Sequence, residues 1–131
     1  MTQIPGLYIA ESPIAGRGVF TAAPIPAGSL VEMAPVIVIP TEQVSTIHQT
    51  VLHDYYFRWG PQMEAAALLL GNGSLYNHAY EPNLRIELDF GERTVDFYAL
   101  RDIEAGEELT FNYNGEPENQ MPLWFHSDGK R

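Results

Sequence analysis

The clearest pattern of polar and apolar positions along the chain is that of a β-hairpin. Residues 85–90 (RIELDF) alternate polar and apolar side chains, as a strand with one buried face does. A turn follows at Gly91-Glu92-Arg93, and residues 94–100 (TVDFYAL) form the return strand. Because the apolar faces of the two strands must meet, the pattern also fixes their register.

Short apolar segments recur elsewhere and are separated by glycine and proline. This arrangement is typical of many short strands and turns. Strands are expected at residues 7–10 and 17–21, and residues 30–39 are expected to form one strand, or two strands separated at Pro35. We therefore predict a mainly β fold of several short sheets with little helix.

Helical signals are limited to the middle of the chain. Thr41 is predicted to cap a short helix that extends to about His53. Residues 64–70 (EAAALLL) fit a helix or a strand by periodicity alone. The glycine-rich residues 71–73 (GNG) are expected to end either element.

The chain contains one internal similarity. Residues 25–30 (IPAGSL) resemble residues 103–109 (IEAGEEL), because each has an aliphatic residue, a glycine turn and then a strand. Two copies are too few for a repeat protein. We therefore expect the same turn conformation to be used twice.

Length and composition indicate one domain. The chain has 131 residues, a size that suits a single hydrophobic core. We predict one domain over residues 1–131, with a core at about residues 7–114 and a short C-terminal segment at residues 115–131. No apolar segment reaches the roughly 18 residues that a membrane-spanning helix requires. No leader pattern is visible at the N-terminus, so we expect a cytoplasmic protein that does not bind membranes.

The charge is strongly negative and unevenly distributed. The formal net charge is −10, and residues 81–131 hold 12 of the 17 acidic side chains. Such a field repels nucleic acid and favours a basic protein or peptide partner. Acidity that serves only solubility is the alternative explanation.

The residue types exclude several kinds of chemistry. The chain has no cysteine, which excludes disulfides, a thiol nucleophile and cysteine-based zinc sites. None of its four histidines lies four residues from another, so no metal site is expected. The chain also lacks a phosphate-binding loop and an HExxH string.

Three short motifs contain candidate functional residues. Residues 16–18 (GRG) allow a ligand to approach the main chain, although a turn before a strand is the simpler explanation. Asn77-His78 presents an amide and an imidazole to a polar ligand, or caps a loop. Tyr113, taken alone, is most simply a packed tyrosine with one hydrogen bond.

In combination, these motifs resemble those of the SET-domain protein lysine methyltransferases. Residues 12–20 (SPIAGRGVF) and 25–32 (IPAGSLVE) resemble the family's first motif and the strand after it. Residues 71–83 (GNGSLYNHAYEPN) resemble its asparagine–histidine motif, and residues 105–114 (AGEELTFNYN) resemble its tyrosine motif. Residues 53–57 (HDYYF) are similar to the short insert of its smallest members.

The resemblance implies a binding site for S-adenosyl-L-methionine. Gly16, Arg17 and Gly18 are expected to contact the methionine portion of this cofactor, largely through their main chain. Asn77 is expected near its amino-acid end, and His78 near its adenine.

The resemblance also implies methyl transfer to a lysine of a basic protein or peptide. Tyr113 is the expected active-site tyrosine, and Tyr55 is expected to line the lysine channel. Phe111 falls where the family carries a Phe or Tyr that influences the number of methyl groups added, which predicts di- or trimethylation. The alternative is a catalytically inactive SET-like module that binds a basic peptide.

The implied fold is β-clip-like, with a C-terminal segment that threads beneath a loop to form a pseudoknot. The sequence departs from the family where Ala79, Tyr80 and Asn112 replace more frequent residues. Because a cysteine-based zinc module is absent, the candidates to close the lysine channel are Trp124 and Phe125, or a second subunit in a homodimer. A packed C-terminal anchor is the alternative explanation for Trp124 and Phe125. Lys130 is a candidate for automethylation.

Overall fold

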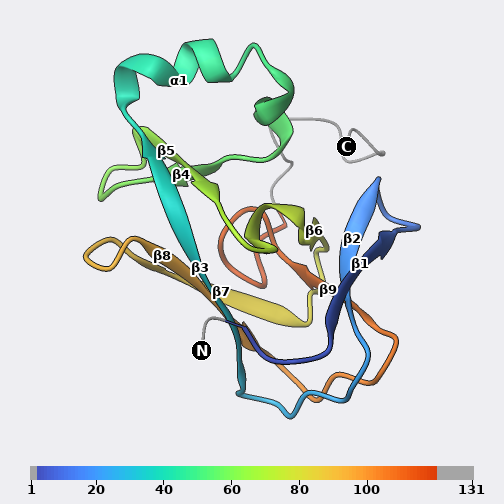
Figure 1. Ribbon diagram of the computed structural model, residues 1–131. Coiled ribbons are helices and arrows are strands. Elements are labelled where there is room, and N and C mark those ends of the chain that lie inside the picture. The colour runs from blue at the N-terminus through green and yellow to red at the C-terminus, as the bar shows by residue number, and fades with distance from the viewer. Residues whose placement is uncertain (1–2, 121–131) are drawn as a thin grey trace.

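The strands form two sheets in the structure, a computed structural model that describes residues 3–120. The strand bounds are β1 Leu7–Glu11, β2 Arg17–Thr21, β3 Leu30–Ile39, β4 Phe57–Trp59, β5 Ala65–Leu69, β6 Asn77–His78, β7 Leu84–Asp89, β8 Thr94–Ala99 and β9 Glu108–Phe111. One sheet has the order β1-β2-β9-β6 and the other the order β4-β5-β3-β8-β7. Figure 1 shows β1 and β2 on one side of the molecule and β4 and β5 on the other. The prediction of a mainly β fold is confirmed.

The predicted hairpin is present as β7 and β8. The two strands pair antiparallel with Asp89 opposite Thr94. The turn is closed by the Asp89 carboxylate, which accepts a hydrogen bond from the main-chain N–H of Glu92 at 3.0 Å. Arg93 takes a left-handed φ of 57° at the end of the turn. The alternating pattern therefore located both strands to within one residue at each end.

Of the two alternatives for residues 30–39, the single strand is correct. β3 pairs with β8 from Leu30 to Pro35, and with β5 from Val36 to Ile39. Pro35 lies where the strand changes its partner, so its missing N–H falls between the two ladders. Its carbonyl accepts a hydrogen bond from the main-chain N–H of Leu70 at 2.8 Å.

The helix in the middle of the chain is α1 (Thr41–Ile47). Its N-cap is Pro40 and no side chain caps its first turn, so the prediction of Thr41 as the cap is wrong by one residue. Pro40 has a φ of −59° and a ψ of 152°, so it precedes the helix and is not part of its first turn. Figure 1 shows α1 beyond the end of β3, at the edge of the molecule.

The predicted extension of this helix to about His53 is also wrong. α1 ends at Ile47, and a separate 3₁₀-helix, η1 (Val51–Asp54), follows. The side chain of Thr50 caps η1 from an extended backbone conformation with ψ of 177°. Because Thr50 caps η1 in this extended conformation, α1 cannot continue through it.

Residues 64–70 contain the strand β5 rather than a helix. β5 lies between β4 and β3 and pairs antiparallel with both. A second 3₁₀-helix, η2 (Gly73–Leu75), follows it. A Cβ atom at Gly73 would lie 2.6 Å from the Cβ of Leu69, so only glycine lets η2 pack this closely on β5.

The internal similarity corresponds to one turn conformation used twice, as predicted. Ile25 and Ile103 exchange main-chain hydrogen bonds, both at 2.8 Å. Gly28 and Gly106 follow in the two turns with φ values of 83° and 90°. The two segments therefore pair with each other as well as resembling each other in sequence.

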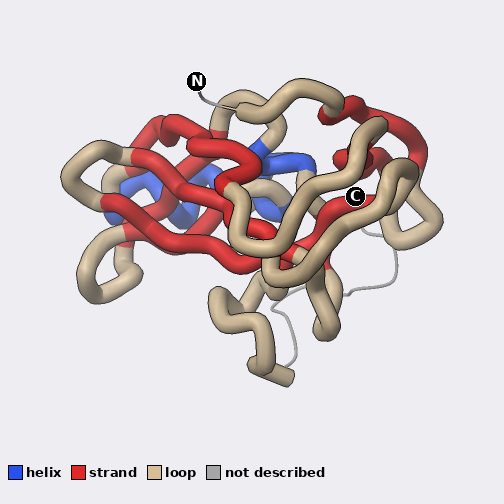
Figure 2. The backbone as a smooth tube through the Cα atoms, turned by 90° about the horizontal axis from the view of Figure 1, so that it is seen from below, coloured by secondary structure: helices blue, strands red, loops and turns tan. Residues whose placement is uncertain are grey.

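β9 determines where the candidate motifs meet. It lies between β2, to which it is antiparallel, and β6, to which it is parallel. Its residues Leu109 and Phe111 belong to one hydrophobic core that also contains side chains of the other sheet, such as Val95. Figure 2 shows the strands from below, with the helical segments behind them. The threading of the C-terminal segment beneath a loop stays a prediction.

Within residues 3–120, no helix has the length and apolar composition that crossing a membrane would require.

Candidate active site

The parallel pairing of β6 and β9 brings two of the predicted motifs together. Asn77 lies opposite Thr110, and His78 lies opposite Phe111. The main-chain N–H of Ala79 donates to the carbonyl of Phe111 at 3.1 Å and extends the pairing. Asn77-His78 is therefore held beside the strand that leads into Tyr113.

The Asn77 side chain is the polar centre of this site. It is 1% exposed, and its amide nitrogen donates to the Glu108 carboxylate at 2.8 Å. The same nitrogen lies 3.1 Å and 3.2 Å from the main-chain carbonyls of Ala15 and Arg17. The Glu108 carboxylate also accepts a hydrogen bond from the Ser12 hydroxyl at 2.7 Å. Asn77 and Glu108 thus connect β6 and β9 to the loop before β2.

The predicted glycine motif begins at the end of that loop and continues into β2, which starts at Arg17. Gly16 and Arg17 are exposed, and Gly16 has a left-handed φ of 45°. Gly18 is buried, and a Cβ atom there would collide with the Glu108 carboxylate and lie 2.9 Å from the Asn77 amide nitrogen. Gly18 therefore permits the close packing. The main-chain carbonyl of Gly16 accepts a hydrogen bond from the Ser12 N–H at 2.9 Å, and that of Arg17 accepts one from Asn77 at 3.2 Å.

Tyr113 is held at both of its ends. Its main-chain N–H donates to Nδ1 of His78 at 3.0 Å. Its hydroxyl donates to the main-chain carbonyl of Tyr76 at 2.6 Å. Because Nδ1 of His78 accepts a hydrogen bond, the neutral imidazole carries its proton on Nε2. These two bonds fix the position of the Tyr113 ring relative to β6.

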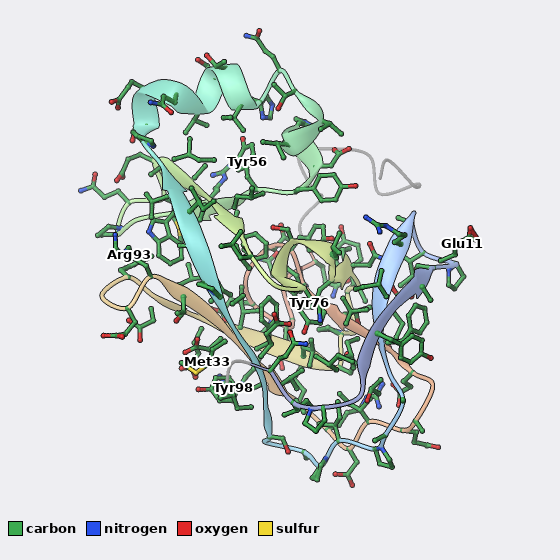
Figure 3. The ribbon with its side chains drawn as sticks, in the orientation of Figure 1. Glu11, Met33, Tyr56, Tyr76, Arg93 and Tyr98 are labelled. Atoms are coloured by element: carbon green, nitrogen blue, oxygen red, sulfur yellow. The ribbon has the colours of Figure 1, made fainter. Side chains whose placement is uncertain are left out.

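Tyr76, whose carbonyl accepts the Tyr113 hydroxyl, forms a buried hydrogen-bonded pair with Glu32. Tyr76 is 0% exposed and Glu32 is 2% exposed. The Tyr76 hydroxyl donates to Oε1 of Glu32 at 2.6 Å, and Oε2 of Glu32 accepts the main-chain N–H of Asn72 at 3.0 Å. Burial raises the pKa of Glu32, and burial next to Glu32 raises the pKa of Tyr76 well above its usual value. Figure 3 shows Tyr76 near the centre of the molecule.

Aromatic rings form the apolar side of the site. Phe111, which is 2% exposed, stacks on Phe57 with ring centroids 5.3 Å apart. It also contacts Phe97 at 5.5 Å and the ring of Tyr113 at 4.9 Å. Tyr55 is half-buried in the segment between η1 and β4, and Phe57, two residues later, joins this segment to Phe111.

Two of the residues that depart from the family pattern also shape this site. The ring of Tyr80 meets that of His78 edge to face, with centroids 4.4 Å apart. Asn112 accepts a hydrogen bond from the main-chain N–H of Asn114 at 3.0 Å and donates to the carbonyl of Asn119 at 2.6 Å. Both replacements therefore have local contacts and remove no group that the candidate site uses.

The structure collects most of the predicted site residues in one place. The residues joined by the contacts above are Gly18, Asn77, His78, Phe111 and Tyr113, with Gly16 and Arg17 immediately before Gly18. Tyr55 lies two residues before Phe57, whose ring stacks on Phe111. Trp124, Phe125 and Lys130 lie outside the described residues. Among the described residues, no group of three or more His, Asp or Glu is arranged to hold a metal ion.

Sequence reasoning missed several residues that complete the site. They are Ser12, Glu32, Phe57, Tyr76 and Glu108. A signal existed for two of them. Glu32 is the one acidic residue in the otherwise apolar residues 30–39, and Glu108 opens the string that ends at Tyr113.

The side chains fit a positively charged nucleoside ligand. The Glu108 carboxylate contacts Asn77, and the exposed residues Gly16 and Arg17 precede buried Gly18. The half-buried rings of Tyr80 and Tyr113 both contact that of His78. Oxygen acceptors suit an ammonium group, and aromatic faces suit an adenine and a sulfonium. This combination matches the chemistry of S-adenosyl-L-methionine.

Comparison with known proteins identifies the family. The SET domain model matches residues 16–114. A fission yeast (Schizosaccharomyces pombe) relative, named histone-lysine N-methyltransferase, H3 lysine-37 specific, is 34% identical over 93% of this chain and 78% of its own length. Human histone-lysine N-methyltransferase 2B is 35% identical over 82% of this chain, which spans only 4% of that much longer protein.

Solved structures show the same fold. A Plasmodium falciparum protein described as a histone methyltransferase superposes with a TM-score of 0.65 at 27% identity, and covers 86% of this chain and 95% of its own. The chain belongs to the SET-domain family, the class of protein lysine methyltransferases.

Proposed function

We propose that this chain binds S-adenosyl-L-methionine beside residues 16–18 and Asn77-His78 and transfers its methyl groups to a lysine of a basic protein. The observation that supports this most directly is the placement of Tyr113. Its main-chain N–H donates to His78, and its hydroxyl donates to the carbonyl of Tyr76. These two hydrogen bonds fix Tyr113 relative to the cofactor motif.

Each residue of the cofactor motif is given a defined task. Gly16 and Arg17, which are exposed residues, contact the methionine portion largely through their main chain, and buried Gly18 lets this segment lie close to Asn77. Asn77 serves the amino-acid end and His78 the adenine. When bound, the cofactor supplies a methyl group activated by a positive sulfonium.

Tyr113 orients the reacting amine. Its hydroxyl proton is engaged by the Tyr76 carbonyl at 2.6 Å, so the lone pairs on the same oxygen are directed to another donor. An amine N–H of the substrate lysine is that donor. Fixing the amine in line with the methyl group is the main task in a displacement of this kind.

The aromatic side of the site favours the reactive form of lysine. A lysine ammonium has a pKa of about 10.4 in water and must lose a proton before it attacks. Apolar surroundings disfavour the charged form and lower that pKa. Phe57, Phe97 and Phe111 supply such surroundings next to Tyr113. Tyr55 is proposed to line the channel that admits the lysine.

A histone is the proposed substrate. The fission yeast and human relatives are named as histone-lysine methyltransferases. The net charge of −10 attracts a lysine- and arginine-rich protein and not a nucleic acid. The test is incubation of the chain with the cofactor and histone H3, followed by mass spectrometry of the histone. Cofactor binding without any methylated histone or other basic protein would contradict the proposal.

The alternative of an inactive module has no support among the described residues, because Asn77, His78 and Tyr113 are all present and joined. The homodimer and the cytoplasmic location remain predictions. Light scattering on the purified chain checks the first, and fractionation of cells that express it checks the second.

A further inference from the structure

We infer that the buried pair Glu32 and Tyr76 is a positioning device that sets the carbonyl on which the Tyr113 hydroxyl rests. This inference depends on the proposed role of Tyr113. It gives a task to two residues that the proposed chemistry does not itself use.

The Glu32 carboxylate holds both ends of one short loop. Oε2 accepts the main-chain N–H of Asn72 at 3.0 Å, and Oε1 accepts the hydroxyl of Tyr76 at 2.6 Å. The turn η2 (Gly73–Leu75) lies between these two points. One carboxylate therefore closes the loop into a single conformation immediately before Asn77.

Tyr76 connects the Glu32 carboxylate to the candidate active site. Its side chain points into the core, where its ring packs against Phe97 with centroids 4.5 Å apart. Its main-chain carbonyl accepts the Tyr113 hydroxyl at 2.6 Å. Because side chain and carbonyl belong to one backbone unit, release of the Tyr76 hydroxyl from Glu32 allows that carbonyl to turn away from Tyr113.

Stability alone does not explain a carboxylate at this place. Glu32 lies in β3 next to the fully buried Val31, and removing its charge from water is unfavourable. Burial raises its pKa, which is the expected sign of that penalty. An apolar pair of similar volume would stabilise a core at least as well. The carboxylate instead fixes the orientation of two donors, the Asn72 N–H and the Tyr76 hydroxyl, through directional hydrogen bonds.

The test compares turnover in variants of the full chain. Tyr76→Phe keeps the ring and removes only the hydroxyl, and Glu32→Gln keeps the shape and removes the charge. Each is expected to lower kcat for methyl transfer to histone H3 roughly tenfold or more, with the KM for the cofactor much less affected. The double variant is expected to lose no more than the larger single loss, because both changes release the same carbonyl.

The control is Ile25→Ala, which removes an unrelated buried side chain in the paired turns. It is expected to lower the melting temperature and to leave kcat unchanged below that temperature. If Tyr76→Phe does not fold, Glu32→Gln carries the same comparison.

Wild-type kcat in folded Tyr76→Phe or Glu32→Gln overturns the inference, and so do losses that multiply in the double variant. A different result would contradict the proposed function itself. That result is no methylation by the wild-type chain, or full activity in Tyr113→Phe.

Discussion

The amide nitrogen of Asn77 donates to the carboxylate of Glu108 at 2.8 Å, from β6 to β9. Because Glu108 also accepts the Ser12 hydroxyl, one carboxylate joins three segments that are far apart in the sequence. Asn77 is thereby oriented by its neighbours before any ligand binds. Preorganisation of this kind reduces the entropy lost on binding.

Removing this carboxylate is expected to weaken cofactor binding. In Glu108→Ala, the Asn77 amide and the Ser12 hydroxyl lose a charged acceptor, so Asn77 is no longer held in one orientation. The expected dissociation constant for S-adenosyl-L-methionine rises about tenfold, or ~1.4 kcal/mol, measured by isothermal titration calorimetry. Glu92→Ala, in the exposed hairpin turn, is the control and binds as the wild type does. An unchanged constant in Glu108→Ala would show that Asn77 needs no such support.

Replacing Gly18 by alanine is expected to weaken cofactor binding more than the same replacement at Gly91. The added Cβ of Gly18→Ala meets the Glu108 carboxylate and the Asn77 amide nitrogen, so both side chains must move. In Gly91→Ala, the added atom lies 3.7 Å from its nearest neighbour, an ordinary contact. Calorimetry is expected to show more than a tenfold loss of cofactor affinity in the first variant and none in the second. Equal affinities in the two variants would contradict the role given to this loop.

The sequence predicted local elements better than the contacts between them. The hairpin of β7 and β8 was predictable because alternation and a glycine turn determine it locally. The helix from Thr41 was misjudged at both ends, since Thr50 caps a second element that propensity alone does not reveal. The single strand through Pro35 depends on a change of partner from β8 to β5, and no local pattern encodes that change.

The candidate site shows the same division. Asn77, His78 and Tyr113 were predictable because family resemblance identifies motifs. Glu32 and Glu108 stand out in the sequence, but their partners, Tyr76 and Asn77, were not predictable because they lie 44 and 31 residues away. Such pairs form only when sheets assemble, so they are a property of the fold and not of any sequence window.

Phe111 provides a test of the number of methyl groups added. The wild-type chain is expected to produce di- or trimethyl-lysine, because Phe at this position carries no hydroxyl to bind water near the amine. Phe111→Tyr adds that hydroxyl beside Tyr113 and is expected to shift the product towards monomethyl-lysine, as measured by mass spectrometry. Thermal unfolding shows whether the buried ring stack tolerates the change. A wild-type product that stops at one methyl group, with cofactor in excess, would contradict this prediction.

Glu107 is expected to make stability depend on pH. The hydrogen bond from Arg101, with further bonds from the Glu104 N–H and Asn83, lowers the pKa of Glu107 to about 2. Because the folded pKa lies below the unfolded value of 4.5, this stabilisation is present above the unfolded value and is lost as the pH falls towards the folded one. Solvent screening limits it to about 1 kcal/mol.

Urea unfolding of the wild type and Glu107→Gln measures this contribution. The free energy of unfolding is expected to differ between the two proteins at neutral pH, and the difference is expected to shrink at about pH 3. A constant difference over that range would mean that the carboxylate charge does not stabilise the fold.

The central claim is that Tyr113 orients a lysine for methyl transfer in a site that binds the cofactor independently. Its most direct test is the rate of histone H3 methylation by the wild type and by Tyr113→Phe, with cofactor affinity measured in parallel. The account predicts a methylated product from the wild type, a rate at least about a hundredfold lower in the variant, and similar cofactor affinity in both. Methylation by Tyr113→Phe at the wild-type rate would contradict it.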